Sequence, residues 1–218
     1  MSEASETGSD TAAPFIEVVK DGPLIVKNCR HLLDTEGDAI GTKPTMALCR
    51  CGKSRKKPFC DGTHREVGFC GDTEEGGLPD RIDTYEGKQV TVYENRRACC
   101  HEGICTEYLP LVFRPGESPR IKPDEGYAYE VERVVRRCPS GALWYARDGK
   151  SGKDEVREPA IRVQKDRQYD VVGGIALENP GGEQPVIPEH YTLCRCGRSH
   201  RKPFCDGTHL ECGFSDEE

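Results

Sequence analysis

Two short segments of this chain carry three cysteines and one histidine at identical spacing. The candidate ligands are Cys49, Cys51, Cys60 and His64 in the first segment and Cys194, Cys196, Cys205 and His209 in the second. Thiolate sulfur and imidazole nitrogen are the donors with which proteins hold zinc and iron–sulfur groups. Each segment is therefore a candidate metal centre.

The spacing indicates how the four side chains of one segment could converge. Two cysteines separated by one residue point to the same side of an extended loop. Residues four apart share one face of a helical turn. We therefore expect Cys49 and Cys51 on a loop and Cys60 and His64 on a short helix. Asp61 suits the N-cap of that helix, and a helix N-terminus favours anionic thiolates.

The two segments belong to an internal duplication. Residues 46–69 recur as residues 191–214 at a constant offset of 145, without a gap. Alternating apolar residues precede each copy, in 22–33 and 159–170, and indicate a strand that leads into the motif. Each copy is expected to contain strands, then the cysteine loop, then a short helix.

On residue types alone, two kinds of centre remain equal alternatives. Three cysteines and one histidine suit tetrahedral zinc, although zinc sites usually pair their ligands as C-x2-4-C rather than C-x-C. The same donors suit an iron–sulfur cluster.

Both copies resemble the CDGSH iron–sulfur domain of the mitoNEET-like family. They match C-x-C-x2-S-x3-P-x-C-D-G-[ST]-H over sixteen residues, including Ser54, Pro58, Asp61 and Gly62 of the first copy. The resemblance implies one [2Fe–2S] cluster in each copy, held by the three cysteines and the histidine, and makes a structural zinc site a minor alternative. Single-motif members pair as homodimers, so the resemblance also implies an internal pseudo-dimer here.

A third group of cysteines lies between the copies. Cys99 and Cys105 are six residues apart, and Cys138-Pro follows. This spacing corresponds to the bacterial ferredoxin run C-x2-C-x2-C…C-P with its second cysteine replaced by Glu102. The segment resembles a divergent single-cluster ferredoxin domain. We expect a [3Fe–4S] or [4Fe–4S] cluster with Glu102 or Cys100 as a possible fourth ligand. Buried reduced cysteines and a redox-active disulfide are the alternatives.

These patterns predict an α+β protein of small, coil-rich domains. Two strand-and-short-helix cluster units form the internal pseudo-dimer, and a ferredoxin-like α+β insert separates them. The expected bounds are 1–14 for a disordered acidic tail, 15–70 for the first unit, 77–147 for the insert and 158–218 for the second unit. Within the insert we expect strands at 88–93 and 143–145 and a helix over 124–137 that Pro139 terminates.

Composition excludes several other classes of protein. The first residues lack the apolar region of a secretory signal, and no run approaches the roughly 20 apolar residues of a membrane span. The chain has 13 cysteines, an odd number, which disfavours a disulfide framework. Its net charge of −7 gives no sign of nucleic-acid binding. We expect a cytoplasmic monomer away from membranes.

Electron transfer to an unidentified redox partner protein is the expected function, because two types of cluster would exceed the needs of a simple carrier. Cluster storage, sensing or transfer is the alternative. The chain lacks a dinucleotide fingerprint, a Walker loop, a nucleophile elbow and an H-E-x-x-H helix. We therefore expect no enzyme activity of its own, and any catalysis would belong to a partner.

Overall fold

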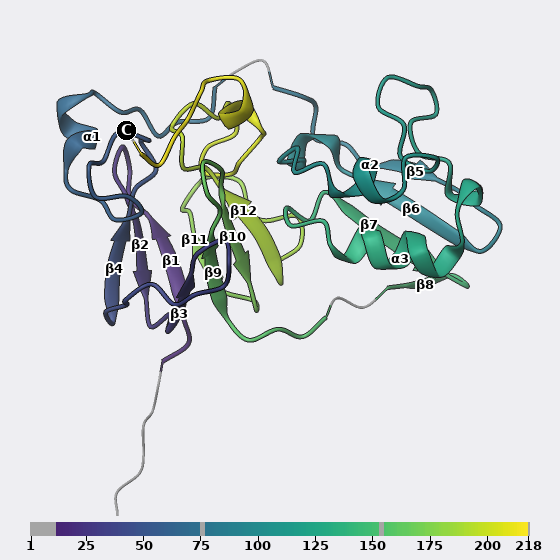
Figure 1. Ribbon diagram of the computed structural model, residues 1–218, viewed down its shortest axis with the longest axis horizontal. Coiled ribbons are helices and arrows are strands. Elements are labelled where there is room, and N and C mark those ends of the chain that lie inside the picture. Colours follow the sequence, from purple (N-terminus) through teal and green to yellow (C-terminus); the bar gives the residue numbers. More distant parts are fainter. Residues whose placement is uncertain (1–11, 75–76, 153–154, 218) are drawn as a thin grey trace, which may run out of the picture.

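The computed structural model describes residues 12–74, 77–152 and 155–217, and these contain three four-stranded sheets. Two of the sheets stand side by side, and the third lies with helix α3 at the opposite end of the molecule (Figure 1). Residues 1–11 of the expected acidic tail lie outside the described residues. Within the described ranges, no helix combines the length and apolarity that crossing a bilayer requires.

The duplication extends well upstream of the cysteine motifs. The elements of the first repeat are β1 (Phe15–Val18), β2 (Leu24–Lys27), β3 (His31–Leu33), β4 (Thr45–Leu48) and α1 (Thr63–Glu66). Those of the second are β9 (Ala160–Val163), β10 (Tyr169–Val172), β11 (Ala176–Glu178), β12 (His190–Leu193) and the 3-10 helix η3 (Thr208–Leu210). Every element of the second repeat begins 145 residues after its counterpart. Strands are present in both upstream segments that the sequence indicated, 22–33 and 159–170, although at this offset the counterpart of 22–33 is 167–178.

The two sheets are built by exchanging one strand between the repeats. Their strand orders are β11-β1-β2-β4 and β12-β10-β9-β3. Strand β3 of the first repeat pairs in parallel with β9, placing Leu32 beside Ile161. Strand β11 of the second repeat pairs in parallel with β1, placing Leu177 beside Ile16. Neither repeat completes its own sheet, so each depends on the other for an edge strand.

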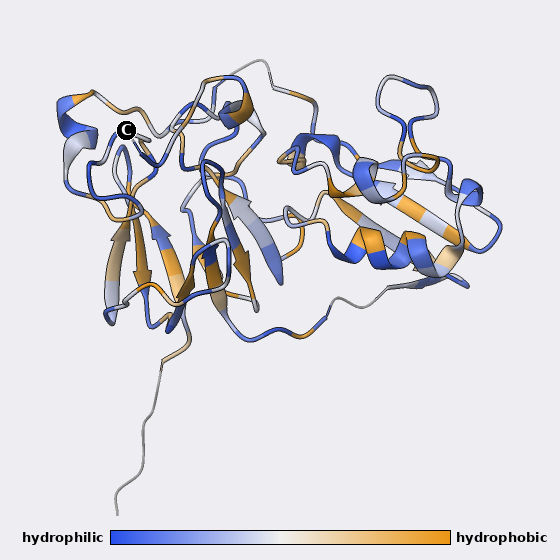
Figure 2. Ribbon diagram, viewed as in Figure 1, coloured by the Kyte–Doolittle hydropathy of each residue, from blue (hydrophilic) through white to orange (hydrophobic). Residues whose placement is uncertain are grey.

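One apolar core joins the two sheets. Strands β2 and β10 both alternate buried and half-buried residues, as expected for strands with one face in a core. The same buried cluster contains Leu24 and Leu48 from the first repeat and Tyr191 and Phe204 from the second. Figure 2 shows apolar residues along these strands. Because the core is shared, the repeats fold as one unit rather than two.

The insert forms an antiparallel sheet covered by a helix. Its strands are β5 (Asp83–Tyr85), β6 (Val90–Glu94), β7 (Leu143–Arg147) and β8 (Lys150–Ser151), in that order. Its helical segments are η1 (Arg96–Ala98), α2 (Ile104–Tyr108), η2 (Pro123–Glu125) and α3 (Ala128–Arg136). Both expected strands are present, whereas the expected helix 124–137 is divided. Gly126 has extended backbone angles, which separate η2 from α3.

The backbones of the two cysteine loops contact each other. A Cβ on Gly52 would lie 2.5 Å from the carbonyl oxygen of Cys196, and a Cβ on Gly197 would lie 2.6 Å from that of Cys51. Both glycines have positive φ angles, 76° and 77°. Only glycine allows this backbone conformation and this close approach together.

We expect Gly52→Ala to lower the unfolding midpoint of the protein more than Gly37→Ala does. Both positions have a positive φ angle, so each substitution costs about 1 kcal/mol in backbone strain. Gly37 faces open space, whereas at Gly52 the added methyl group clashes with the other loop and costs about 1–3 kcal/mol more. Denaturant unfolding followed by circular dichroism measures the difference. Equal losses would show that the close approach contributes nothing to stability.

Candidate metal centres

Backbone hydrogen bonds close each cysteine loop onto the strand that precedes it. The N–H of Cys49 donates to the carbonyl of Pro58 at 2.8 Å, and the N–H of Cys60 donates to the carbonyl of Ala47 at 2.8 Å. The second copy has the same two bonds, from Cys194 to Pro203 at 2.8 Å and from Cys205 to Thr192 at 3.1 Å. The end of the loop therefore returns to the strand that precedes it. This brings the third cysteine of each motif next to the first two.

All eight predicted side chains lie in the expected pairs, but the expectation that Cys60 lies on the helix was wrong, because Cys60 precedes α1 and Cys205 precedes η3. In the first copy, Cys49 Sγ is 3.6 Å from Cys51 Sγ, and Cys60 Sγ is 3.3 Å from His64 Nδ1. The corresponding distances in the second copy are 3.7 Å for Cys194 and Cys196 and 3.4 Å for Cys205 and His209. The two pairs of each copy are neighbours: burial raises the pKa of Cys60, and the Cys49 thiol adds to that shift.

Two other motif residues hold the loop in shape. Ser54 Oγ donates to the carbonyl of Phe59 at 2.6 Å. Asp61 accepts hydrogen bonds from the N–H of Arg55 at 2.9 Å and from that of Thr63 at 3.1 Å. The N-cap of α1 is Gly62, with a φ angle of 96°, and not Asp61 as the sequence suggested. The left-handed turn at Gly62 shifts the helix start by one residue, yet Asp61 still binds its first N–H group.

Each loop also prepares one of its cysteines to be a thiolate. The Cys51 thiol donates to Cys49 and lowers its pKa, and the backbone N–H groups of Ser54 and Gly52 lower it further. In the second copy, the Cys196 thiol lowers the pKa of Cys194 in the same way. Thiolate is the form that binds metal. The geometry and the chemistry of the donors therefore both fit a metal or cluster.

The third group of cysteines also converges. Cys99, Cys105 and Cys138 line one cavity of the insert, together with Cys100 and Glu102. Burial and the thiols of Cys99 and Cys138 raise the pKa of Cys105 to about 11. Burial and the Cys99 thiol likewise raise the pKa of Cys138. Three neighbouring thiols in a desolvated cavity fit the soft donor set of an iron–sulfur cluster.

Family models match both kinds of site. The model described as "Iron-binding zinc finger CDGSH type" matches residues 21–65 and 168–210. The model described as "Divergent 4Fe-4S mono-cluster" matches residues 85–148. The chain belongs to the CDGSH iron-binding family and carries a divergent 4Fe-4S mono-cluster domain between its two motifs. It is therefore an iron–sulfur protein with the layout that the sequence predicted.

Two curated proteins match part of the chain. "Uncharacterized protein YjdI" of Escherichia coli K12 is 39% identical over 61 residues, which are 28% of this chain and 80% of that protein. YjdI of Escherichia coli O157:H7 matches with the same figures. No solved structure matches the chain.

The two CDGSH sites differ in their exposure. Cys60 and His64 of the first site are half-buried, whereas Cys205 and His209 of the second are 3% and 5% exposed. Lys56 beside the first site is exposed, but its counterpart Arg201 is buried. The same motif therefore sits in two different environments.

Each C-x-C segment contains a buried arginine that the spacing of the ligands does not indicate. Arg50 and Arg195 lie between the paired cysteines, and each is 3% exposed. Arg50 donates from Nε to the carbonyl of Gly22 and from Nη2 to that of Val19, both at 2.7 Å. Burial lowers the pKa of Arg50. Arg195 of the second copy forms an ion pair with Asp216 instead. The sequence did carry a sign of these arginines, because both C-x-C segments have arginine as the middle residue. Arginine is rarely buried without a partner.

The candidate fourth ligands of the insert have different environments. Both carboxylate oxygens of Glu102 accept hydrogen bonds from the second repeat, one from Arg167 Nη1 and one from Gln168 Nε2, each at 2.9 Å. Cys100 is 1% exposed, and burial raises its pKa well above the usual value. The contacts of Glu102 give its carboxylate a structural role at the junction with the second repeat.

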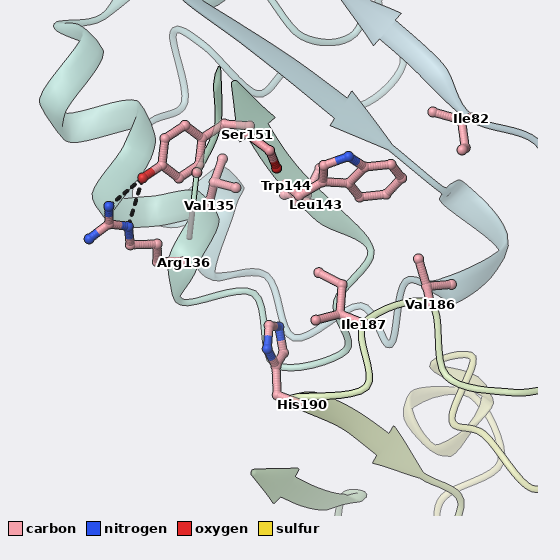
Figure 3. Close-up of a pocket in the computed structure, with 11 residues that line it drawn as sticks. Ile82, Val135, Arg136, Leu143, Trp144, Ser151, Val186, Ile187 and His190 are labelled. Atoms are coloured by element: carbon pink, nitrogen blue, oxygen red, sulfur yellow. Dashed lines mark hydrogen bonds between the residues drawn. The ribbon is translucent and has the colours of Figure 1, made fainter. Parts of the chain in front are cut away.

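An apolar pocket lies elsewhere, between the insert and the second repeat (Figure 3). Val135, Leu143, Trp144 and Ile187 form part of its wall, and Arg136 Nε at its edge donates to the hydroxyl oxygen of Tyr145 at 2.9 Å. Its lining, as far as the described residues show, includes no cysteine. The pocket is therefore separate from the metal centres.

We expect Glu102→Gln to retain the iron of the insert and Cys138→Ala to lose it. Glutamine keeps an oxygen for Arg167, whereas alanine removes one of the three converging thiols. Iron and sulfide per chain, measured after anaerobic purification, should fall by about three or four in Cys138→Ala only. An equal loss of iron and sulfide in Glu102→Gln would contradict this prediction and indicate that Glu102 is a ligand.

Proposed function

We propose that this chain is an electron-transfer protein. It holds a [2Fe–2S] cluster in each CDGSH site and a [3Fe–4S] or [4Fe–4S] cluster in the insert. The observation that carries the proposal is the direct contact between the two CDGSH loops, where the backbone of Gly52 packs against that of Cys196 and Gly197 against Cys51. Two cluster sites in contact, with a site of another type in the same folded unit, suit passage of electrons better than independent storage.

The exchanged strands support an internal pseudo-dimer. The constant offset of 145 between equivalent elements, and the reciprocal pairing of β3 with β9 and β11 with β1, relate the repeats as two subunits would be related. Such a chain needs no second copy to complete its CDGSH pair, so we propose a monomer.

The bound clusters would supply one-electron redox chemistry, which the histidines tune. Neutral imidazole in place of a thiolate removes one negative charge from the ligand set and makes reduction easier. Four-cysteine plant-type centres have potentials near about −400 mV, and two-histidine Rieske centres range from roughly −150 to +300 mV. A centre with one histidine is expected between these values.

The first CDGSH site is the proposed docking place for a redox partner protein. Its Cys60 and His64 side is half-buried, and Lys53, Arg55 and Lys56 beside it are exposed. Exposed positive charge favours a partner with an acidic surface and speeds encounter. We assign no catalysis to this chain. Its free cysteines suit a reducing compartment, and we propose the cytoplasm.

Cluster transfer is the second candidate function, favoured by the exposure of the first site. A histidine ligand that solvent can reach can take up a proton and release its metal. The two functions separate in one experiment with the loaded protein. It is reduced, then mixed either with an oxidised one-electron carrier or with an apo-ferredoxin. Oxidation with retained iron supports electron transfer, whereas iron and sulfide that move to the apo-ferredoxin support cluster transfer.

We expect anaerobically purified protein to be coloured and to contain about seven or eight irons with matching sulfide. An absorption spectrum with iron, sulfide and zinc determined per chain measures this. About four irons would leave only the CDGSH pair. Colourless protein that carries zinc would contradict the proposed function.

We expect His64→Cys and His209→Cys each to lower the reduction potential of its site. The added thiolate charge disfavours the reduced state, and the loss of the imidazole removes a protonatable ligand, so the pH dependence should also flatten. Optical redox titration at several pH values measures both effects. An unchanged potential in either variant would show that its histidine is not a ligand.

A further inference from the structure

The insert packs against the second CDGSH site through the residues that follow Cys99. A Cβ on Gly207 would lie 2.9 Å from Cβ of His101, so His101 sits directly on the turn between Cys205 and His209. The next residue, Glu102, accepts the hydrogen bonds from Arg167 and Gln168. Segment 99–102 thus has a ligand cysteine of the insert at one end and binds the second repeat along its length.

The other ligand loop of the insert reaches the same repeat. Gly141, three residues after Cys138, has a φ angle of 68°, and a Cβ on it would lie 3.0 Å from Cβ of Ile187. Glu183 of the second repeat links the insert to that repeat. It accepts hydrogen bonds from Arg97 Nε of the insert at 3.0 Å and from Arg201 Nε of the second repeat at 2.7 Å. The insert is therefore held at its two cysteine loops.

Cys100 lies in the interior of this junction. It is 1% exposed and adjacent to the ligand Cys99. Cys100 lines the same cavity as Cys99, Cys105 and Cys138. Cys100 therefore fills the interior beside the cysteines of the insert, next to the segment that contacts Gly207.

The first CDGSH site touches the second on another side. The contact runs through Gly52 and Gly197, next to Cys51 and Cys196, whereas the insert contacts the turn at Gly207. Figure 1 shows the loop that carries η3 between the loop of α1 and the insert. The second site thus has one neighbour on each side.

We propose that the second CDGSH site is the middle member of the three, with segment 99–102 coupling it to the insert. The order in space is first CDGSH site, second CDGSH site, insert, although the insert is central in the sequence. This inference rests on the proposed electron-transfer function. With clusters bound, each step would move one electron, oxidising one site and reducing its neighbour, with one-electron donor and acceptor proteins at the two ends and no change of covalent bonds.

Electron paramagnetic resonance of the fully reduced, loaded chain tests the order. His64→Cys marks the signal of the first site and His209→Cys that of the second, because a ligand change shifts the spectrum. In each background, spin relaxation is compared with and without Cys138→Ala, which removes the insert cluster. Magnetic coupling falls steeply with distance. Relaxation of the second-site signal should therefore slow several-fold in Cys138→Ala, and that of the first should change far less.

A first-site signal that responds as strongly as the second, or the absence of any response, overturns the order while leaving electron transfer intact. A chain that binds no iron overturns both. A second measurement uses Glu102→Gln, with Glu107→Gln on the exposed face of α2 as the matched control. Removal of the Glu102 charge should raise the potentials of the second site and the insert together and leave the first unchanged. A shift confined to one of the two, or an equal shift in the control, also overturns the proposal.

Discussion

The exchange of β3 and β11 between the two sheets is the constraint on which the rest of the structure depends. Each repeat supplies three antiparallel strands to one sheet and an edge strand to the other. The repeats therefore cannot separate without losing both sheets and the core between them. This arrangement fixes the two cysteine loops back to back, where Gly52 and Gly197 allow contact between their backbones. The spacing of the metal centres is thus a consequence of strand pairing.

Charge compensation explains much of the rest of the motif. Several thiolates in a buried loop are costly unless positive charge or N–H dipoles surround them. The backbone N–H groups around Cys49 and Cys194, which lower the pKa of both thiols, supply part of this. The motif residues that are not ligands keep the loop in the shape that directs these groups inward. Asp61 does so through its hydrogen bonds to Arg55 and Thr63.

The insert gives the two nearly identical motifs different exposure to solvent. It covers the second site, where His209 is 5% exposed, and leaves the first half-buried. A buried histidine ligand is shielded from protons and water, whereas an exposed one can meet a partner or release its cluster. The difference in exposure between the two sites therefore arises from tertiary packing, since their cysteines, histidine and spacing are the same.

The sequence by itself determined the pairing of the motif cysteines and histidines, the duplication, the insert and most of its elements. These depend on local geometry: residues two apart in an extended loop point the same way, and the turn at Gly62 brings His64 back beside Cys60 although Cys60 precedes the helix. Only the tertiary structure decided the strand exchange, the counterpart of 22–33 and the position of the insert against Gly207. Alternating apolar residues show which face of a strand is buried but not which strand lies beside it. Buried Arg50 and the contacts of Glu102 likewise depend on segments far apart in the sequence, which meet only when the chain packs.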